Sequence, residues 1–205
     1  KLFNSGLNMS LKKHENNQKK KVALIGCGLI GQSWAVSFLN AGFNVSLFDP
    51  VEGVTTQAKE KIKAKLRDLQ NYKLLKNEKI SDYLSKIHLA EDLSQAVAGS
   101  FYVQESGPED LNIKKELTIA IDAATPENIP IASSTSGIPA SLYASDISGK
   151  HRCIVAHPIN PPHQLSKVMS HREPLTGQEI GYALASPTLA QVLILSHRYQ
   201  HLLHL

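Results

Sequence analysis

The amino-acid sequence predicts an α/β fold with a doubly wound, mostly parallel sheet, and three observations support this prediction. Short apolar runs alternate with helical patterns from residue 21 to residue 156, as expected for consecutive β–α units. The first run, residues 22–25, is apolar at every position, which is typical of a parallel strand buried on both faces. A Gly-x-Gly-x-x-Gly turn joins this run to a helical pattern, so the expected fold is of the Rossmann type.

The helix after the glycine turn is indicated by apolar residues at helical spacing. Ile30, Trp34 and Phe38 share one face, and Gly42 stands where a C-cap glycine belongs. Residues 44–48 form the second expected strand, which completes a β–α–β unit of about 30 residues.

Residues 54–72 form the next expected helix, with one apolar face and basic residues over the remainder. The simpler interpretation is a solvated amphipathic helix. The functional alternative is a basic surface that receives an anionic substrate such as a coenzyme A ester. The apolar positions are Val54, Ala58, Ile62, Leu66 and Leu69, and the basic ones are Lys59, Lys61, Lys63, Lys65 and Arg67.

The rest of the chain continues the alternation of strands and helices. Acidic residues open the longest of the later helices, where the helix dipole favours them. Helices are expected at residues 81–85, 92–97 and 108–124, and strands at residues 87–90, 101–104, 131–133 and 153–156.

The glycine turn has the features of a dinucleotide site; the alternative is a glycine-rich turn without a ligand. Gly26 permits the tight turn, Gly28 lets the backbone approach a pyrophosphate, and Gly31 lets the helix pack close to the strand. The first helical N–H groups then face the phosphates. Asp49, about 20 residues on, is expected to accept hydrogen bonds from the adenosine ribose. Its charge opposes a 2′-phosphate and no arginine precedes Arg67, so the predicted cofactor is NAD rather than NADP.

Composition and charge narrow the range of functions. The 205 residues are 42% hydrophobic and 20% charged, which is ordinary for a globular protein with one core. A net charge of +4 without a basic–aromatic array argues against nucleic-acid binding, and no apolar run has the length of a membrane span. Two cysteines, Cys27 and Cys153, offer no disulfide framework, so a cytoplasmic location is expected. No metal site is predicted.

Two polar stretches follow expected strands and should lie beyond their carboxyl ends, where ligands bind in open parallel sheets. His157, in the second stretch, suits a general base, because histidine titrates near neutral pH. Ser136 is placed to hydrogen-bond the substrate oxygen, and Asn160 to hold the substrate or the nicotinamide amide. The alternatives are a turn-forming serine and a structural histidine.

Five stretches follow one another along the chain: GCGLIGQSWA, FDP, YVQESGPEDLNIKKEL, SSTSGIPAS and CIVAHPINPP. Together they resemble the NAD-binding domain of the 3-hydroxyacyl-CoA dehydrogenase family. The nearest resemblance is to the branch of lambda-crystallin and L-gulonate 3-dehydrogenase, where HPxNPP replaces the HFFNP of the acyl-CoA enzymes. It extends from Lys21 to about Leu165, and residues 21–165 are the predicted NAD-binding domain.

The resemblance implies roles for individual residues. Ser136 matches the catalytic serine, His157 the proton-accepting histidine and Asn160 the asparagine beside it. Positions implied to bind NAD or to line its pyrophosphate turn are Gly26, Gly28, Leu29, Ile30, Gly31, Asp49, Glu109, Lys114, Ser136 and Asn160.

Beyond Leu165 the sequence departs from the family pattern. Relatives carry a glutamate twelve residues after the histidine, which orients it; here that position is Met169, so we expect His157 to lack a carboxylate partner. Residues 166–205 form an atypical tail, and the helical carboxyl-terminal domain that completes the family's substrate pocket and dimer interface is expected to be absent. A truncated or misframed gene model would explain this.

The amino-terminal segment, residues 1–20, is rich in Asn and Lys and lacks periodicity, so it is predicted to be disordered. Met9 is a candidate biological start.

The resemblance implies NAD-dependent oxidation of an L-3-hydroxy acid, with L-gulonate as the expected substrate and His157 as base. The alternatives are a 3-hydroxyacyl-CoA dehydrogenase and a catalytically impaired, crystallin-like NAD-binding protein. A homodimer is expected only where the carboxyl-terminal domain is present.

Overall fold

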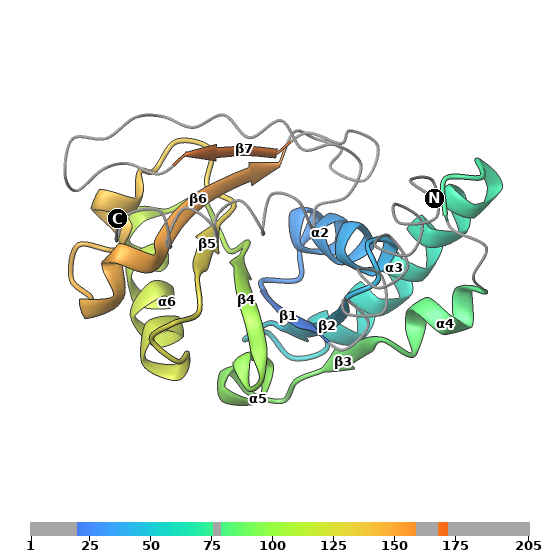
Figure 1. Cartoon of the computed structure of the whole chain (residues 1–205), viewed down its shortest axis with the longest axis horizontal. Helices are drawn as coiled ribbons and strands as arrows, with labels where there is room; N and C mark the ends of the chain where they lie inside the picture. The colour runs from blue at the N-terminus through green and yellow to red at the C-terminus, as the bar shows by residue number, and fades with distance from the viewer. Residues whose placement is uncertain (1–19, 76–78, 159–167, 172–205) are drawn as a thin grey trace, which may run out of the picture.

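The computed structural model describes residues 20–75, 79–158 and 168–171. Within them lies a seven-stranded sheet with the order β3-β2-β1-β4-β5-β6-β7 (Figure 1). Strands β1 to β6 pair in parallel, and β7 runs antiparallel to β6. The order 3-2-1-4-5-6 is that of the doubly wound dinucleotide-binding fold, which confirms the predicted fold class.

The predicted strands all form, with small shifts at their ends. The strands are β1 (Lys21–Ile25), β2 (Asn44–Phe48), β3 (Ile87–Leu89), β4 (Ser100–Glu105), β5 (Ile131–Ser133), β6 (Cys153–Pro158) and β7 (Val168–His171). The helices are α2 (Leu29–Asn40), α3 (Val54–Asn71), α4 (Ile80–Leu84), α5 (Leu93–Val97), α6 (Leu111–Ala124) and α7 (Ala140–Tyr143), with a 3-10 helix at Ser148–Arg152.

Both faces of the sheet are covered, and β1 shows this residue by residue. Val22 and Leu24 belong to one buried cluster, which includes side chains of α2, α3 and α4. Ala23 and Ile25 belong to a second cluster, which includes side chains of α5, α6 and α7. Successive strand side chains point to opposite faces, so an all-apolar strand is what two covered faces require.

The turn from α2 into β2 is set by Gly42, as predicted. Gly42 has φ +96°, and its N–H donates to the carbonyl of Leu39 at 2.9 Å. The N–H of Phe43 donates to the carbonyl of Phe38 at 3.0 Å, which completes a Schellman motif. The chain therefore turns back at once to place β2 beside β1.

Helix α6 begins later than its sequence suggests. Asp110 is its N-cap, because the Asp110 side chain accepts a hydrogen bond from the N–H of Ile113 at 3.0 Å. Glu109 is therefore outside the helix, not in its first turn as expected at residues 108–124, and its carboxylate is free to contact another loop.

Arg152, at the end of the 3-10 helix, joins the start of β6 to the end of α6. Its guanidinium is 4% exposed and pairs with the carboxylate of Asp122 at 2.6 Å. It also donates to the backbone carbonyls of Asp122, Thr125, Pro126 and Ile129. Because the guanidinium satisfies carbonyls at the carboxyl end of α6, it fixes the connection that leads into β5.

The predictions for residues 1–19, for Asn160 and for most of the tail lie outside the described residues. Only residues 168–171 of the tail are described, where β7 extends the sheet.

Candidate cofactor and catalytic site

The glycine turn between β1 and α2 has the geometry that its spacing predicts. Gly26 has φ +91°, which favours glycine, and a Cβ there would meet the backbone of Ser106 at 2.7 Å. A Cβ on Gly31 would lie 2.0 Å from the carbonyl oxygen of Gly26, so α2 packs against the turn more closely than any side chain allows. Gly28 has nothing within 4 Å of such a Cβ, which leaves its backbone open to a ligand.

Asp49 directly follows β2 and contacts the glycine turn. One carboxylate oxygen accepts a hydrogen bond from the N–H of Cys27 at 2.8 Å, and the other accepts one from the N–H of Val51 at 3.1 Å. A carboxylate offers about four lone-pair positions, so two stay available for hydroxyl donors. Asp49 thus has a second task besides the predicted contact with a ribose: it holds the turn.

The thiol of Cys27 is not set up as a nucleophile. Burial and, to a lesser degree, the negative charge of Asp49 raise its pKa to about 12. The thiolate is the reactive form of cysteine. Cys27 therefore serves the turn as a small apolar side chain.

A cleft of about 530 Å³ opens beside the glycine turn, between α2 and α3. Gly28, Leu29 and Gln32 line it on one side. Helix α3 lines the other side with Val54, Gln57, Ala58, Lys61, Ala64, Lys65 and Asp68. Two of the basic residues of this amphipathic helix, Lys61 and Lys65, thus line the same opening as the turn.

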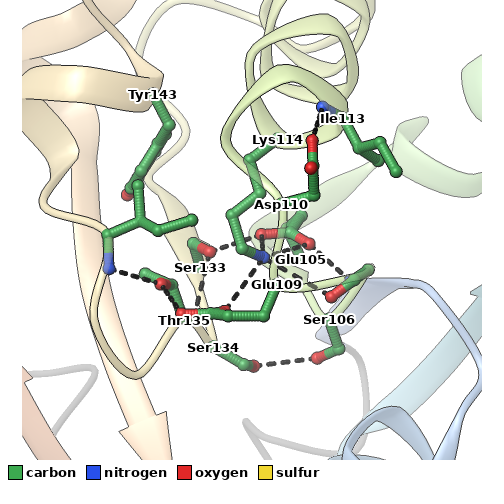
Figure 2. A network of polar contacts seen from close by, with 12 residues as sticks. Glu105, Ser106, Glu109, Asp110, Ile113, Lys114, Ser133, Ser134, Thr135 and Tyr143 are labelled. Atoms are coloured by element: carbon green, nitrogen blue, oxygen red, sulfur yellow. Dashed lines mark hydrogen bonds and ion pairs between the residues drawn. The ribbon is translucent and has the colours of Figure 1, made fainter.

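Beyond the carboxyl ends of β4 and β5 lies a polar network (Figure 2). At its centre is a buried ion pair, in which Nζ of Lys114 lies 3.1 Å from both carboxylate oxygens of Glu105. Both side chains are about 1% exposed. The hydroxyl of Ser133 and the N–H of Gly107 also donate to Glu105, so its charge is satisfied on all sides. In this structure the Nζ of Lys114 contacts Glu105. The contact of Lys114 with NAD, which the family resemblance implies, stays a prediction.

Glu109 organises the loop that carries Ser136. One of its carboxylate oxygens accepts from the hydroxyl of Thr135 at 2.6 Å, and from the N–H groups of Ser136 and Gly137 at 3.0 Å each. The hydroxyl of Ser136 lies at 3.3 Å from the same oxygen. Burial alone would raise the pKa of Glu109, but these hydrogen bonds and the charge of Lys114 together hold the pKa below its ordinary value of 4.5.

His157 lies near the end of β6, in contact with the loop that follows β5. Its Nδ1 lies 3.1 Å from the carbonyl oxygen of Ser134. In the antiparallel register of β6 and β7, His157 faces Met169 on the neighbouring strand. Met169, which stands where relatives are expected to carry a glutamate, is therefore the cross-strand neighbour of His157. The methionine at that position does not leave His157 without a partner, because a main-chain carbonyl contacts its ring.

The structure brings together residues that are far apart in the sequence. Ser136 and Lys114 both contact Glu109, and Ser134 links its loop to His157. Sequence reasoning missed Glu105 and Ser134. Glu105 did carry a signal: it is an acidic residue that directly follows an otherwise buried strand pattern at residues 101–104.

The chain matches a known family from the start of β1 to a point beyond β6. Residues 21–180 match 3-hydroxyacyl-CoA dehydrogenase, NAD binding domain. The chain belongs to the 3-hydroxyacyl-CoA dehydrogenase family. The resemblance stated from the sequence and the predicted cofactor, NAD, are both confirmed, as is the assignment to a family of dehydrogenases.

Three relatives illustrate the breadth of the family. The lambda-crystallin homolog of Homo sapiens is 36% identical over 72% of this chain and 46% of the relative. The L-carnitine dehydrogenase of Streptomyces coelicolor is 34% identical over 73% of this chain and 46% of the relative. Among solved structures, 3-hydroxybutyryl-CoA dehydrogenase of Escherichia coli has a TM-score of 0.71 and 26% identity, over 86% of this chain and 35% of that one. The chain spans about half the length of the curated relatives it matches.

None of the helices in the described part of the chain is both long enough and apolar enough to cross a membrane.

Proposed function

We propose that this chain carries the NAD-binding and proton-transfer half of an enzyme that oxidises an L-3-hydroxy acid to the 3-keto acid. The observation that carries the proposal is the convergence of the glycine turn, the loop of Ser136 and the histidine of β6 at the carboxyl ends of one parallel sheet. Ligands of such sheets bind at this edge.

The residues present fit NAD. The open backbone at Gly28 and the amino end of α2 suit a pyrophosphate, because helical N–H groups and the helix dipole attract negative charge there. The free lone pairs of Asp49 suit the ribose hydroxyls and oppose a 2′-phosphate. When bound, NAD supplies the acceptor for a hydride.

His157 would take the proton of the substrate hydroxyl as the hydride leaves the same carbon. The reaction then balances: one C–H bond and one O–H bond break, and a carbonyl forms. Ser136 would hydrogen-bond the substrate oxygen, and its contact with Glu109 at 3.3 Å is the longest of the four to that carboxylate oxygen, so it is the easiest to exchange. Asn160 would hold the substrate or the nicotinamide amide.

We propose L-gulonate as the substrate. The family resemblance and the lambda-crystallin homolog support this choice. Carnitine, named for another relative, is also a 3-hydroxy carboxylate, so the class of substrate is shared. The proposal includes a cytoplasmic location and a homodimer in a protein that has the family's full length.

A second candidate is oxidation of a 3-hydroxyacyl-CoA ester. The cleft beside the glycine turn favours it, because Lys61 and Lys65 line that opening and would attract the phosphates of a coenzyme A ester.

NADH formation tests both candidates. The chain is assayed alone and joined after Leu165 to the corresponding carboxyl-terminal half of the human lambda-crystallin homolog, with saturating NAD and L-gulonate, L-carnitine or 3-hydroxybutyryl-CoA. We expect NAD binding in both forms, little turnover by the chain alone, and turnover of a free hydroxy acid by the fusion that His157→Ala abolishes. A general base contributes about 10²–10⁴-fold to such a rate.

Turnover of the coenzyme A ester alone would replace the first candidate by the second. NAD binding without turnover of any substrate in the fusion would contradict both and favour an NAD-binding structural protein.

A further inference from the structure

The contact between His157 and Ser134 decides which ring nitrogen of the histidine carries a proton. Nδ1 of His157 lies 3.1 Å from the carbonyl oxygen of Ser134. A carbonyl oxygen only accepts hydrogen bonds, so the contact is a hydrogen bond when Nδ1 is protonated. In a neutral imidazole this leaves the lone pair on Nε2, the form that a general base needs at that atom.

We propose that Ser134 is a positioning residue, whose side chain fixes its own carbonyl so that His157 is held in the Nδ1–H tautomer with Nε2 free. The tautomer is a property of the chain by itself; only its catalytic consequence rests on the proposed function.

The hydroxyl of Ser134 is saturated by neighbours from two other elements. It accepts from Nε1 of Trp34 on α2 at 3.0 Å and from Nε2 of Gln104 on β4 at 2.8 Å. Both are N–H donors, so they occupy both lone pairs of the oxygen. Its own proton is then left for the hydroxyl of Ser106, 2.8 Å away. A hydroxyl with three fixed partners has one orientation.

Those partners are themselves rigid. Trp34 is 1% exposed, and Gln104 is fully buried, with its carbonyl oxygen accepting from the hydroxyl of Tyr102 at 2.6 Å. The backbone N–H of Ser134 donates to the carbonyl of Glu105 at 2.8 Å, next to the buried ion pair with Lys114. Both the hydroxyl and the backbone N–H of Ser134 are therefore hydrogen-bonded to buried groups. Its carbonyl has little freedom to turn away from His157.

A carbonyl partner serves both protonation states of the histidine. Before proton transfer it keeps Nδ1–H in place, and after transfer the imidazolium still donates Nδ1–H, now as a charge-assisted hydrogen bond. The carbonyl thus orients the ring in a chain whose cross-strand position opposite His157 is a methionine.

The test uses nitrogen NMR of the full chain with ¹⁵N-labelled histidine, at mildly alkaline pH where imidazole is neutral. The chain has 9 histidines, so the His157→Gln spectrum identifies the signals of His157 by their loss. We expect Nδ1 of His157 at the protonated and Nε2 at the unprotonated shift. In Ser134→Ala both shifts should move toward the Nε2–H tautomer that predominates for histidine in water.

Trp34→Phe keeps an aromatic ring but removes one of the donors to Ser134, and it should move the shifts in the same direction by less. It decides the matter should Ser134→Ala fail to fold. Ser37→Ala is the matched control, because within the described part of the chain the hydroxyl of Ser37 bonds along α2, to the carbonyl of Ser33. It should leave the His157 shifts unchanged.

An Nε2–H tautomer in the unmodified chain would overturn the proposal, as would shifts that Ser134→Ala and Trp34→Phe both leave unmoved. Neither result bears on NAD binding or on the oxidation assay, so the proposed function is tested separately.

Discussion

The N–H of Cys27 donates to the carboxylate of Asp49 at 2.8 Å, so the end of β2 holds the turn that follows β1. The acidic residue that the dinucleotide pattern assigns to a ribose is thereby also a structural part of the phosphate-binding turn. A change at Asp49 should act on both tasks, and the two can be separated by the choice of substitution.

Asp49→Ala should weaken NAD binding by about 1.5–3 kcal/mol, the contribution of a hydrogen bond to a charged group. Asp49→Asn keeps one oxygen that can accept from Cys27 but sets an NH2 group against the N–H of Val51, so it should lose less thermal stability than Asp49→Ala while losing preference for NAD over NADP. Titration calorimetry with NAD and NADP, beside thermal unfolding, measures both effects. Equal affinity of the unmodified chain for the two cofactors would contradict the role of Asp49.

Gly28→Ala and Gly31→Ala should separate ligand binding from folding. A Cβ on Gly28 meets nothing within 4 Å, so the free energy of unfolding should change by less than about 1 kcal/mol, whereas NAD affinity should fall because the methyl group occupies the approach to the backbone. A Cβ on Gly31 would lie 2.0 Å from Gly26 oxygen, so this variant should lose both stability and binding. Urea unfolding and NAD titration of the pair provide the comparison; unchanged NAD affinity in Gly28→Ala would show that the cofactor does not approach there.

Protonation of the Glu109 carboxylate should make the chain less stable in acid. Its pKa is held below 4.5 in the folded chain, so its contribution to stability is fully present above that pH and is lost as the pH falls through the lower folded value. Glu109→Gln removes the charge. The difference in urea midpoint between the unmodified chain and this variant should therefore be larger at pH 6 than well below 4.5. A difference that stays constant with pH would mean that the loop of Ser136 does not depend on the ionised carboxylate.

Arg152→Met should destabilise the chain by about 3–5 kcal/mol, because it leaves the carboxylate of Asp122 and four carbonyls without their common donor. The matched control is Lys115→Met, which breaks a solvent-accessible ion pair with Asp146, whose two side chains are 34% and 60% exposed, and should cost less than about 1 kcal/mol. Denaturant unfolding of the two variants measures the contrast. Similar losses in both would rule out the anchoring role of Arg152.

The regular elements could be predicted from the sequence because each is specified locally. Helix α3 carries its apolar face over five turns and ends at Asn71, one residue before the expected end. Gly42 terminates α2 with hydrogen bonds that span only a few residues. Helix α7 was missed because its four residues are too few to show a helical periodicity. Strand β7 was missed because nothing in the sequence of either strand indicates that it pairs with β6.

Of the candidate site, the glycine turn was predictable and the network around Ser134 was not. The turn is one continuous segment with fixed spacing. Ser134, by contrast, owes its role to Trp34, 100 residues away, and to Gln104, 30 residues away. Serine in a loop has many ordinary uses, so its type gives no hint of such partners.

The central position of β1 has a consequence for how the chain acquires its structure during synthesis. Strands β1 to β3 and helices α2 to α4 all lie before residue 90, and they bury Val22 and Leu24. The other face of β1, with Ala23 and Ile25, finds most of its partners later in the chain, and its edge toward β4 pairs only then. On the ribosome, β1 therefore has one uncovered face and one unpaired edge until β4 has been made. Proteolysis of arrested chains should find β1 protected in full only once β4 has emerged from the ribosome.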